Sequence, residues 1–278
     1  MASISIIVPS YNQGHLIAHT LDSILSQGVE DLDVFVADGG SKDATVGVLE
    51  RYGDRIKWVS ERDRGQTDAI NKGLRQARGD VVAYINSDDT YEPGAVRRAL
   101  ELLDANPGVE FVYGDANLID ENGGLIEHTH AVDFDIGVLT YDHNFICQPA
   151  SFWRRSLVQR IGPFDESLQY LMDYEWFLRA AHSGARFLHA REPWANLRLH
   201  SACKTVMGST TPGHDLARVR REILSRYRRR FGPAWLTSGV HRALKVAYRG
   251  KKLTKDLLEN GALPQSSMRQ RMQRGNAS

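Results

Sequence analysis

The sequence predicts an α/β fold in which helices cover both faces of a mostly parallel sheet, followed by a basic helical extension. Over the first 115 residues, short apolar runs rich in Val and Ile alternate with helical stretches. Such alternation requires crossover connections, which join parallel strands. The predicted strands are almost wholly apolar, as strands buried on both faces must be. Beyond about residue 209 the composition becomes helical and basic, which predicts an appendage to the main domain.

Four strand–helix units and a fifth strand account for the first half. The predicted strands span residues 4–9, 33–38, 56–61, 81–86 and 109–113. The predicted helices span residues 14–27, 42–52, 67–77 and 93–106. The last helix is expected to start on Pro93, because the first helical position does not need a backbone N–H.

The alternation ends after Gly114, and an α+β second half is expected. The turn sequence Glu121-Asn122-Gly123-Gly124 lies between apolar flanks and predicts a hairpin over residues 118–127. Residues 130–150 show no regular pattern. Further helices are expected from near Arg154 and over residues 172–182, and further strands over residues 186–191 and 194–200. These elements complete a predicted domain spanning residues 1–209.

The charge is divided unevenly along the chain. Residues 1–214 carry 19 Lys/Arg and 30 Asp/Glu, a net charge of −11, and residues 215–278 carry 16 and 4, a net charge of +12. We expect an amphipathic helical extension over residues 210–263 and a disordered tail over residues 264–278. An acidic body with a basic appendage suggests two partners.

The basic extension has three interpretations. It is a solvated helical face, or a segment, residues 215–258, that docks on an anionic membrane surface, or a segment whose Leu216, Val219 and Ile223 pack onto the body. No nucleic-acid recognition motif accompanies the charge, so a nucleic-acid partner is not expected. No apolar run reaches the roughly 18–20 residues that span a bilayer. The sequence therefore predicts a cytoplasmic protein, with peripheral docking on the inner face of the cell membrane under the second interpretation.

Polar side chains follow each of the first four predicted strands. They are found in Pro9-Ser10-Tyr11-Asn12, Asp38-Gly39-Gly40-Ser41, Asp63-Arg64-Gly65-Gln66-Thr67-Asp68 and Asn86-Ser87-Asp88-Asp89. In an open parallel sheet, ligands bind beyond the carboxyl ends of the strands. Like charges repel, so acids gathered at one edge point to a cation or a sugar-bearing ligand.

Each acidic candidate also has a purely structural interpretation. Asp88 and Asp89 suit Mg²⁺ or Mn²⁺, or they cap the following helix or belong to a turn. Asp38 accepts a hydrogen bond from a nucleotide base, or serves ordinary turn chemistry. Asp173 is a general base in apolar surroundings, or stabilises a helix N-terminus.

Two further candidates lie on the last predicted strand. Arg198 and His200 alternate there, so both face one side of the sheet. A cationic pair of this kind suits diphosphate oxygens, although a lone His is more often structural.

Eight motifs then establish a resemblance, and together they cover residues 3–204. They are Ser5-Ile6-Ile7-Val8-Pro9-Ser10-Tyr11-Asn12, Val36-Ala37-Asp38-Gly39-Gly40-Ser41-Lys42-Asp43-Ala44-Thr45, Asp63-Arg64-Gly65 through Asn71-Lys72-Gly73, Asn86-Ser87-Asp88-Asp89, Gln148-Pro149-Ala150-Ser151-Phe152, Gly162-Pro163-Phe164-Asp165-Glu166, Met172-Asp173 and Arg198-Leu199-His200. In this order they resemble the family 2 glycosyltransferases. These enzymes are inverting and nucleotide-sugar-dependent, and they have the GT-A fold with a mostly parallel, Rossmann-like sheet.

The resemblance implies a role for each matched residue. Asp88 is the metal-binding acid of the family's Asp-x-Asp motif, with Asp89 beside it, and Asp173 is the base that acts on the acceptor. Donor-binding residues complete the implied site: Pro9, Tyr11 and Asn12 in the nucleotide pocket, Asp38 at the base, and Asp68, Asn86, Arg198 and His200. Two positions depart from the family pattern, because Asn86 replaces the first acid of Asp-x-Asp and Met172 replaces the Glu of the Glu-Asp pair.

The expected function is inverting transfer of a sugar from a UDP-, GDP- or dTDP-linked donor to a hydroxyl of a glycan or lipid-linked acceptor, with Mg²⁺ or Mn²⁺ as cofactor, in cell-surface polysaccharide synthesis. A sugar nucleotidyltransferase is an alternative, but it would need a Gly-rich basic phosphate loop where Pro9-Ser10-Tyr11-Asn12-Gln13-Gly14 stands. A non-catalytic nucleotide-sugar-binding protein is another. No Gly-x-Gly-x-x-Gly follows the first strand, which argues against a dinucleotide enzyme.

Overall fold

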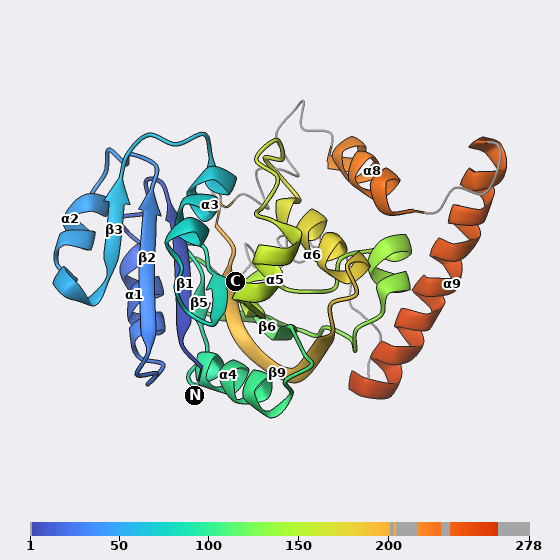
Figure 1. Ribbon diagram of the computed structural model, residues 1–278, viewed down its shortest axis with the longest axis horizontal. Coiled ribbons are helices and arrows are strands. Elements are labelled where there is room, and N and C mark those ends of the chain that lie inside the picture. Colours follow the sequence, from blue (N-terminus) through green and yellow to red (C-terminus); the bar gives the residue numbers. More distant parts are fainter. Residues whose placement is uncertain (1, 201–202, 204–215, 229–233, 261–278) are drawn as a thin grey trace.

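The computed structural model describes residues 2–200, 203, 216–228 and 234–260. Figure 1 shows β1, β2 and β3 side by side with α1 and α2 next to them, and α9 at the opposite end of the molecule. The predicted tail, residues 264–278, lies outside the described residues.

The first half consists of strand–helix units, as predicted. Its strands are β1 (Ile4–Ser10), β2 (Leu32–Asp38), β3 (Lys57–Ser60), β4 (Val81–Tyr84) and the short β5 (Thr90–Tyr91). Its helices are α1 (Ile17–Leu25), α2 (Thr45–Glu50), the 3₁₀ turn η1 (Gly53–Arg55), α3 (Gln66–Gln76) and α4 (Ala95–Ala105). The prediction that α4 starts on Pro93 is wrong, because Gly94 adopts φ 80° and the helix begins only after it.

The second half mixes hairpin, strand and helix. Its strands are β6 (Phe111–Ile119), β7 (Leu125–Thr129), β8 (Ser151–Arg154) and β9 (Phe187–Arg198). Its helical elements are the π-helical η2 (Val138–Asp142), the 3₁₀ turn η3 (Gln148–Ala150), α5 (Arg155–Ile161) and α6 (Met172–His182). The basic extension forms α8 (Leu216–Tyr227) and α9 (Ala234–Asn260).

The nine strands found in the described residues belong to one sheet with the order β3-β2-β1-β4-β8-β6-β9-β5, and β7 pairs with β6. Strands β1 to β4, β6 and β9 run in one direction, while β5, β7 and β8 run in the other. The prediction of a mostly parallel sheet is therefore confirmed. The antiparallel strands β5 and β8 escaped prediction because runs of two and four residues show no period.

Strand β9 corrects a second expectation, since two strands were expected where one continuous strand is found. The sequence Glu192-Pro193 suggests a break because proline cannot donate a ladder hydrogen bond. In the structure, the register between β6 and β9 shifts on both sides of Asp115, opposite Pro193. This bulge accommodates the proline without ending the strand.

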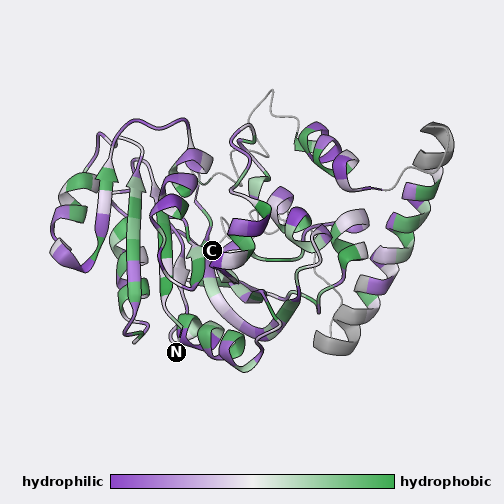
Figure 2. Cartoon of the chain, in the orientation of Figure 1, coloured by the Kyte–Doolittle hydropathy of each residue, from purple (hydrophilic) through white to green (hydrophobic). Residues whose placement is uncertain are grey.

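The two faces of the sheet carry separate cores. Ile4, Ile6 and Val8 of β1 pack with α1, α2 and α4, while Ile7 packs on the other face with α3, α5, α6 and α8. Helix α3 lies so close that a Cβ on Gly73 would stand 2.4 Å from Ile7 Cγ2. Figure 2 shows hydrophobic colour along the strands and mixed colouring on α8 and α9. Helices therefore cover both faces, as predicted.

Helix α8 is part of this second core. Its Ile223 and Leu224 are 0% and 2% exposed. Helix α9 packs against η2, where Tyr248 stacks on Tyr141 with ring centroids 5.7 Å apart. Among the helices described, none is both long and apolar enough to cross a membrane.

Candidate functional site

The predicted metal-binding acid and the last predicted site residue meet at the carboxyl end of β4. His200 Nε2 lies 2.9 Å from Asp88 Oδ2, and the two side chains are only 5% and 14% exposed. Within the described part of the chain, the other carboxylate oxygen of Asp88 has no hydrogen-bond partner. The pair therefore offers one imidazole and one partly uncommitted carboxylate at the sheet edge.

Arg198 links the segments that meet at this sheet edge. Its Nε donates to the backbone oxygen of Asp88 at 3.0 Å, and its Nη1 donates to the backbone oxygens of Asp120 and Glu121 at 3.3 and 3.0 Å. The side chain is buried, and its donors face carbonyl groups. Its geometry thus clamps the β6–β7 turn to the Asp88 loop, while its predicted role at the diphosphate stays a prediction.

Asp89 points inward, away from Asp88. Its Oδ1 accepts from the Arg198 backbone N–H at 3.0 Å, and its Oδ2 accepts from Asn86 Nδ2 at 3.3 Å. Asn86 Oδ1 in turn accepts from Gln66 Nε2 at 2.5 Å. Burial, and then the neighbouring Asp88 charge, hold the pKa of Asp89 well above its ordinary value. Both oxygens are used internally, so Asp88 is the better placed of the two acids to meet a cation.

The predicted nucleotide loops of β1 and β2 are joined to each other. The Asn12 backbone N–H donates to Ser41 Oγ at 2.7 Å, and Asn12 Oδ1 accepts from the Lys42 backbone N–H at 2.9 Å. Pro9 pairs with Ala37 inside the sheet. Tyr11 is 60% exposed beside these loops, so a large aromatic ring is available there.

Asp38 is committed to its own loop. It is 2% exposed. Its Oδ2 accepts from the backbone N–H groups of Gly40 and Ser41 and from Ser60 Oγ at 2.6–3.1 Å, and its Oδ1 accepts from Ser41 Oγ at 2.5 Å. Asp63 approaches the same loop, since a Cβ on Gly39 would stand 2.7 Å from Asp63 Oδ2. The turn interpretation thus accounts for the Asp38 contacts, and Asp63 is the additional carboxylate near the loop.

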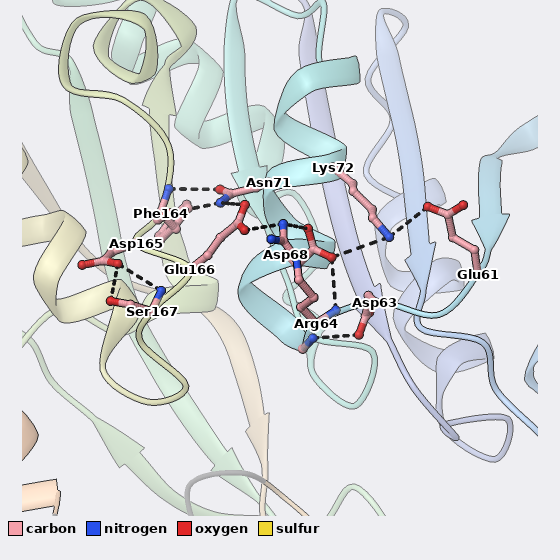
Figure 3. Close-up of polar contacts among 11 residues, drawn as sticks. Glu61, Asp63, Arg64, Asp68, Asn71, Lys72, Phe164, Asp165, Glu166 and Ser167 are labelled. Atoms are coloured by element: carbon pink, nitrogen blue, oxygen red, sulfur yellow. Dashed lines mark hydrogen bonds and ion pairs between the residues drawn. The ribbon is translucent and has the colours of Figure 1, made fainter.

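Asp68 belongs to a polar network that links α3 to the segment 164–167 (Figure 3). Arg64 donates to Asp68 Oδ1 at 3.1 Å and to Glu166 Oε2 at 2.6 Å. Asn71 exchanges hydrogen bonds with the Phe164 backbone in both directions. Burial acts to raise the pKa of Asp68, but the hydrogen bonds from Arg64 and the charge of Lys72 outweigh it, so the pKa is lowered. The network fixes the loop after β3.

Asp173 lies in the first turn of α6, after Leu171, which adopts the left-handed φ of 61°. The residues that follow it on the helix, Tyr174 to Leu178, are buried. Burial, then the charges of Asp173 and Asp89, raise the pKa of Tyr84 well above its ordinary value. Tyr84 is the last residue of β4, so the charges of Asp173 and Asp89 both act on a side chain at the end of this strand.

Sequence reasoning missed one cluster, which is centred on Asp115 of β6. The Asp115 carboxylate contacts His130 Nδ1 at 3.1 Å, His189 Nε2 at 2.8 Å and the Ala131 backbone N–H at 2.9 Å. One signal could have revealed it, because Val112-Tyr113-Gly114-Asp115-Ala116 places a carboxylate inside an otherwise apolar strand. His130 lies in the segment that showed no regular pattern.

The chemistry of the Asp88 and His200 side chains fits a divalent cation. Within the described residues, no three His, Cys, Asp or Glu side chains meet closely enough to hold a metal ion alone. Mg²⁺ and Mn²⁺ accept such incomplete protein shells, because they retain waters and bind phosphate oxygens. One carboxylate, one imidazole and a diphosphate would complete a shell of this kind.

Comparisons with known proteins agree on one family. A family model described as glycosyl transferase family 2 matches residues 5–162. An uncharacterized glycosyltransferase of Rickettsia prowazekii is 29% identical over 73% of this chain, and the chain spans 65% of that relative's length. A PGL/p-HBAD biosynthesis glycosyltransferase of Mycobacterium tuberculosis is 30% identical over 66% of this chain and 73% of its own length.

Two solved structures share the fold. The crystal structure of S. aureus TarS 1–349 in complex with UDP-GlcNAc covers 81% of this chain and 71% of its own, with a TM-score of 0.60 and 19% identity. The mannosyltransferase PcManGT from Pyrobaculum calidifontis, in complex with GDP-Man and Mn²⁺, covers 95% of this chain and 77% of its own, with a TM-score of 0.58 and 21% identity.

Proposed function

The chain belongs to glycosyltransferase family 2, and from this premise we propose that it transfers a sugar, with inversion, from a nucleoside diphosphate to a hydroxyl group of a glycan or lipid-linked acceptor. One observation supports this most strongly. The Asp88–His200 pair lies beyond the carboxyl end of β4, and the charge of Asp173, on α6, acts on Tyr84 at the end of the same strand. Such an arrangement separates two tasks, stabilising the leaving diphosphate and taking up the acceptor proton.

Asp88 and His200 would bind the diphosphate side of the donor. A divalent cation held there would supply positive charge against the negative charge that builds on the leaving group. Asp88 offers a carboxylate oxygen and His200 an imidazole nitrogen, while Arg198 keeps the loop that carries Asp88 in place. Charge stabilisation by preorganised groups of this kind is usually the largest contribution to catalysis.

Asp173 would remove the proton from the acceptor hydroxyl. Inversion needs one base on the face of the sugar opposite the leaving group, by analogy with glycoside hydrolysis. The hydroxyl oxygen then forms the new bond to the anomeric carbon while the bond to the diphosphate breaks, and no covalent intermediate on the protein is required. The first turn of a helix favours the carboxylate form of Asp173, which is the form a base must have.

The relatives support a nucleotide-sugar donor without fixing its base. TarS is seen with UDP-GlcNAc and PcManGT with GDP-Man and Mn²⁺. The mycobacterial relative is named for PGL/p-HBAD biosynthesis, which fits a surface-glycan or lipid-linked acceptor. We keep UDP-, GDP- and dTDP-linked donors as candidates and propose Mg²⁺ or Mn²⁺ as the cofactor.

Helix α9 offers a surface for the second proposed partner, which is the anionic inner face of the cell membrane. Arg242, Val246 and Leu253 are exposed at helical spacing, and Val246 is 69% exposed. Cationic and apolar side chains on one helix face are typical of interfacial helices. Peripheral docking through α9 would bring the protein to a lipid-linked acceptor.

A donor screen tests the proposed function. UDP-, GDP- and dTDP-sugars would be compared by thermal shift with Mn²⁺, Mg²⁺ and EDTA. One donor should raise the unfolding temperature in a metal-dependent way, and nucleotide release should then accelerate with acceptor. Formation of a nucleoside triphosphate and a sugar 1-phosphate when pyrophosphate is added to the donor would instead indicate a nucleotidyltransferase. Binding without any release would indicate a non-catalytic binding protein.

A further inference from the structure

A small cavity lies between β6, β7 and the segment 144–147. Its volume is about 160 Å³, and Asp115, Thr129, His130, Asn144, Phe145 and Cys147 contribute to its lining. Pockets for drug-sized ligands measure roughly 300–1,000 Å³, so this cavity suits a single ring rather than an extended chain. Its lining combines a carboxylate–imidazole pair, an amide and a hydroxyl with an aromatic side chain.

Asp115 fixes the orientation of His130 in this cavity. Burial acts to raise the pKa of Asp115, but hydrogen bonds from His189, from the Ala131 N–H and from His130 outweigh it and lower the pKa. The carboxylate is therefore an acceptor, and His130 Nδ1, 3.1 Å away, is the donor. In the neutral ring, Nε2 is then left as an acceptor. The His130 side chain is 49% exposed, so a ligand can reach it.

Asp115 itself is held from behind by a buried imidazole. His189 is 2% exposed in its side chain and stacks on Tyr113, with ring centroids 5.0 Å apart and an interplanar angle of 10°. Its Nε2 is 2.8 Å from Asp115 Oδ1, while its Nδ1 makes no hydrogen bond within the described residues. Asp133 Oδ1 stands 3.5 Å from that nitrogen. The buried His189 side chain makes its hydrogen bond to the Asp115 carboxylate, and this contact fixes the position of Asp115.

The cavity adjoins the proposed transfer site. Cys147, in its wall, precedes Gln148, whose Nε2 donates to the Tyr84 backbone oxygen at 2.6 Å. Burial raises the pKa of the Cys147 thiol, and the charges of Asp89, Asp173 and Asp115 raise it further. The pKa of the Cys147 thiol thus responds to carboxylates of the cavity and of the proposed transfer site. In the sheet order, β6 lies on the far side of β4 and β8 from the nucleotide loops of β1 and β2.

We propose that this cavity binds one saccharide ring of the acceptor, with His130 Nε2 accepting a hydrogen bond from a ring hydroxyl and Phe145 contacting an apolar face of the ring. The ligand is uncharged, because Cys147 remains a thiol and the Asp115 charge is already matched by three donors. Asp115 is a positioning residue that acts through His130. That the bound saccharide is the acceptor rests on the proposed function. That the cavity binds a saccharide does not rest on it.

Saturation-transfer NMR with free methyl glycosides tests the site. The probes are methyl β-D-glucopyranoside, methyl β-D-galactopyranoside and methyl α-D-mannopyranoside, and the variant is His130→Ala. The matched control is His128→Ala, which removes an imidazole two residues away, on β7, that bonds Asn117 and does not line the cavity. At least one glycoside should bind wild type and His128→Ala equally and bind His130→Ala about 3–10-fold more weakly, the loss expected for one hydrogen bond.

Absence of binding by all three glycosides, or equal affinity in all three proteins, would overturn the proposal. Asp115→Asn should reproduce the loss; since it is buried and can destabilise the fold, the half-exposed His130 variant decides the question alone. Donor binding, followed in parallel by thermal shift, reports the proposed function separately. Saccharide binding without donor binding would contradict the proposed function and leave the cavity site standing, and the converse would do the opposite.

Discussion

His200 Nε2 stands 2.9 Å from Asp88 Oδ2, so the residue two positions beyond the end of β9 completes a site that starts four residues after β4. Arg198 reinforces the same junction through the backbone of Asp88. The junction gives the Asp88 carboxylate a fixed position despite its place in a loop. Its function can be separated experimentally from that of its neighbour Asp89.

Asp88→Asn should abolish most transfer and weaken donor binding in the presence of Mn²⁺, because the amide lacks the charge that a cation needs. The thermal shift of wild type by donor should disappear with EDTA, and that of the variant should be small with or without EDTA. His200→Gln should also weaken the metal response, because it removes the imidazole proposed to complete the metal shell.

The control for this variant is Asp89→Ala. It leaves the Arg198 N–H and Asn86 Nδ2 without their acceptor, which costs about 1–3 kcal/mol for each unpaired buried donor. Its urea midpoint should therefore fall, whereas that of Asp88→Asn should hardly move. Full turnover of Asp88→Asn at saturating donor and metal would refute the assignment of Asp88.

Asp173→Asn should fold, bind donor and lose transfer by about 10²–10⁴-fold, because the isosteric amide keeps the shape and removes the base. Isothermal titration with donor and single-turnover transfer would measure the two properties. A variant with normal turnover and weaker donor affinity would show instead that Asp173 binds substrate.

Acid stability should depend on Asp115. Its pKa is lowered in the folded protein, so it stabilises the fold fully above the unfolded pKa of about 4 and loses this contribution as the pH falls through the folded value. Below about pH 4, wild-type stability should fall more steeply than that of Asp115→Asn. Urea midpoints of both proteins would be measured between about pH 2.5 and 7, because carboxyl groups titrate at roughly pH 2–5. If Asp115 is not involved, the curves of wild type and Asp115→Asn would run parallel.

Helix α8 should be needed for the stability of the main domain. Ile223→Ala removes a fully buried side chain from the second core and should cost about 2–5 kcal/mol. Val246→Ala on α9 is the matched exposed control, with an expected change within about 0.5 kcal/mol. Equal urea midpoints for the two variants would favour the solvated-face interpretation of α8.

The face of α9 that carries Arg242 and Val246 should bind anionic vesicles. A double variant, Arg242→Glu with Val246→Asp, should co-sediment less with phosphatidylglycerol vesicles, since each basic side chain near such a surface contributes about 1 kcal/mol. Wild-type binding should weaken as salt rises through roughly 0.1–0.5 M. Binding that ignores lipid charge, salt and both substitutions would exclude this face as the docking surface.

The sequence predicted the elements whose pattern is local. Helix α6 begins and ends at the predicted residues, because an apolar face at helical spacing is visible without tertiary information. Strands β5 and β8 were missed because each is stabilised by a distant partner: β5 pairs with Asn196 and Ala195, and β8 pairs with β4 and β6.

For the site, likewise, the sequence predicted which residues matter but not how they are arranged. The motif residues Asp88 and Asp173 could be identified from strand ends and from the family resemblance, and the contact between His200 and Asp88 agrees with grouping them. Orientation could not be predicted, since nothing in Asp88-Asp89 says which carboxylate turns inward. The Asp115 cluster was missed because its three members, Asp115, His130 and His189, come from separate strands and a loop.

The pairing of β9 with β5 and β6 sets the order in which a growing chain can mature on the ribosome. Chains emerge from the N-terminus onward, so the Asp88 loop is synthesised before β9, which begins at residue 187. The Asp88 loop then lacks both Arg198 and His200. A nascent chain arrested before β9 should therefore be unable to hold the Asp88 loop in the position that it has in the full chain.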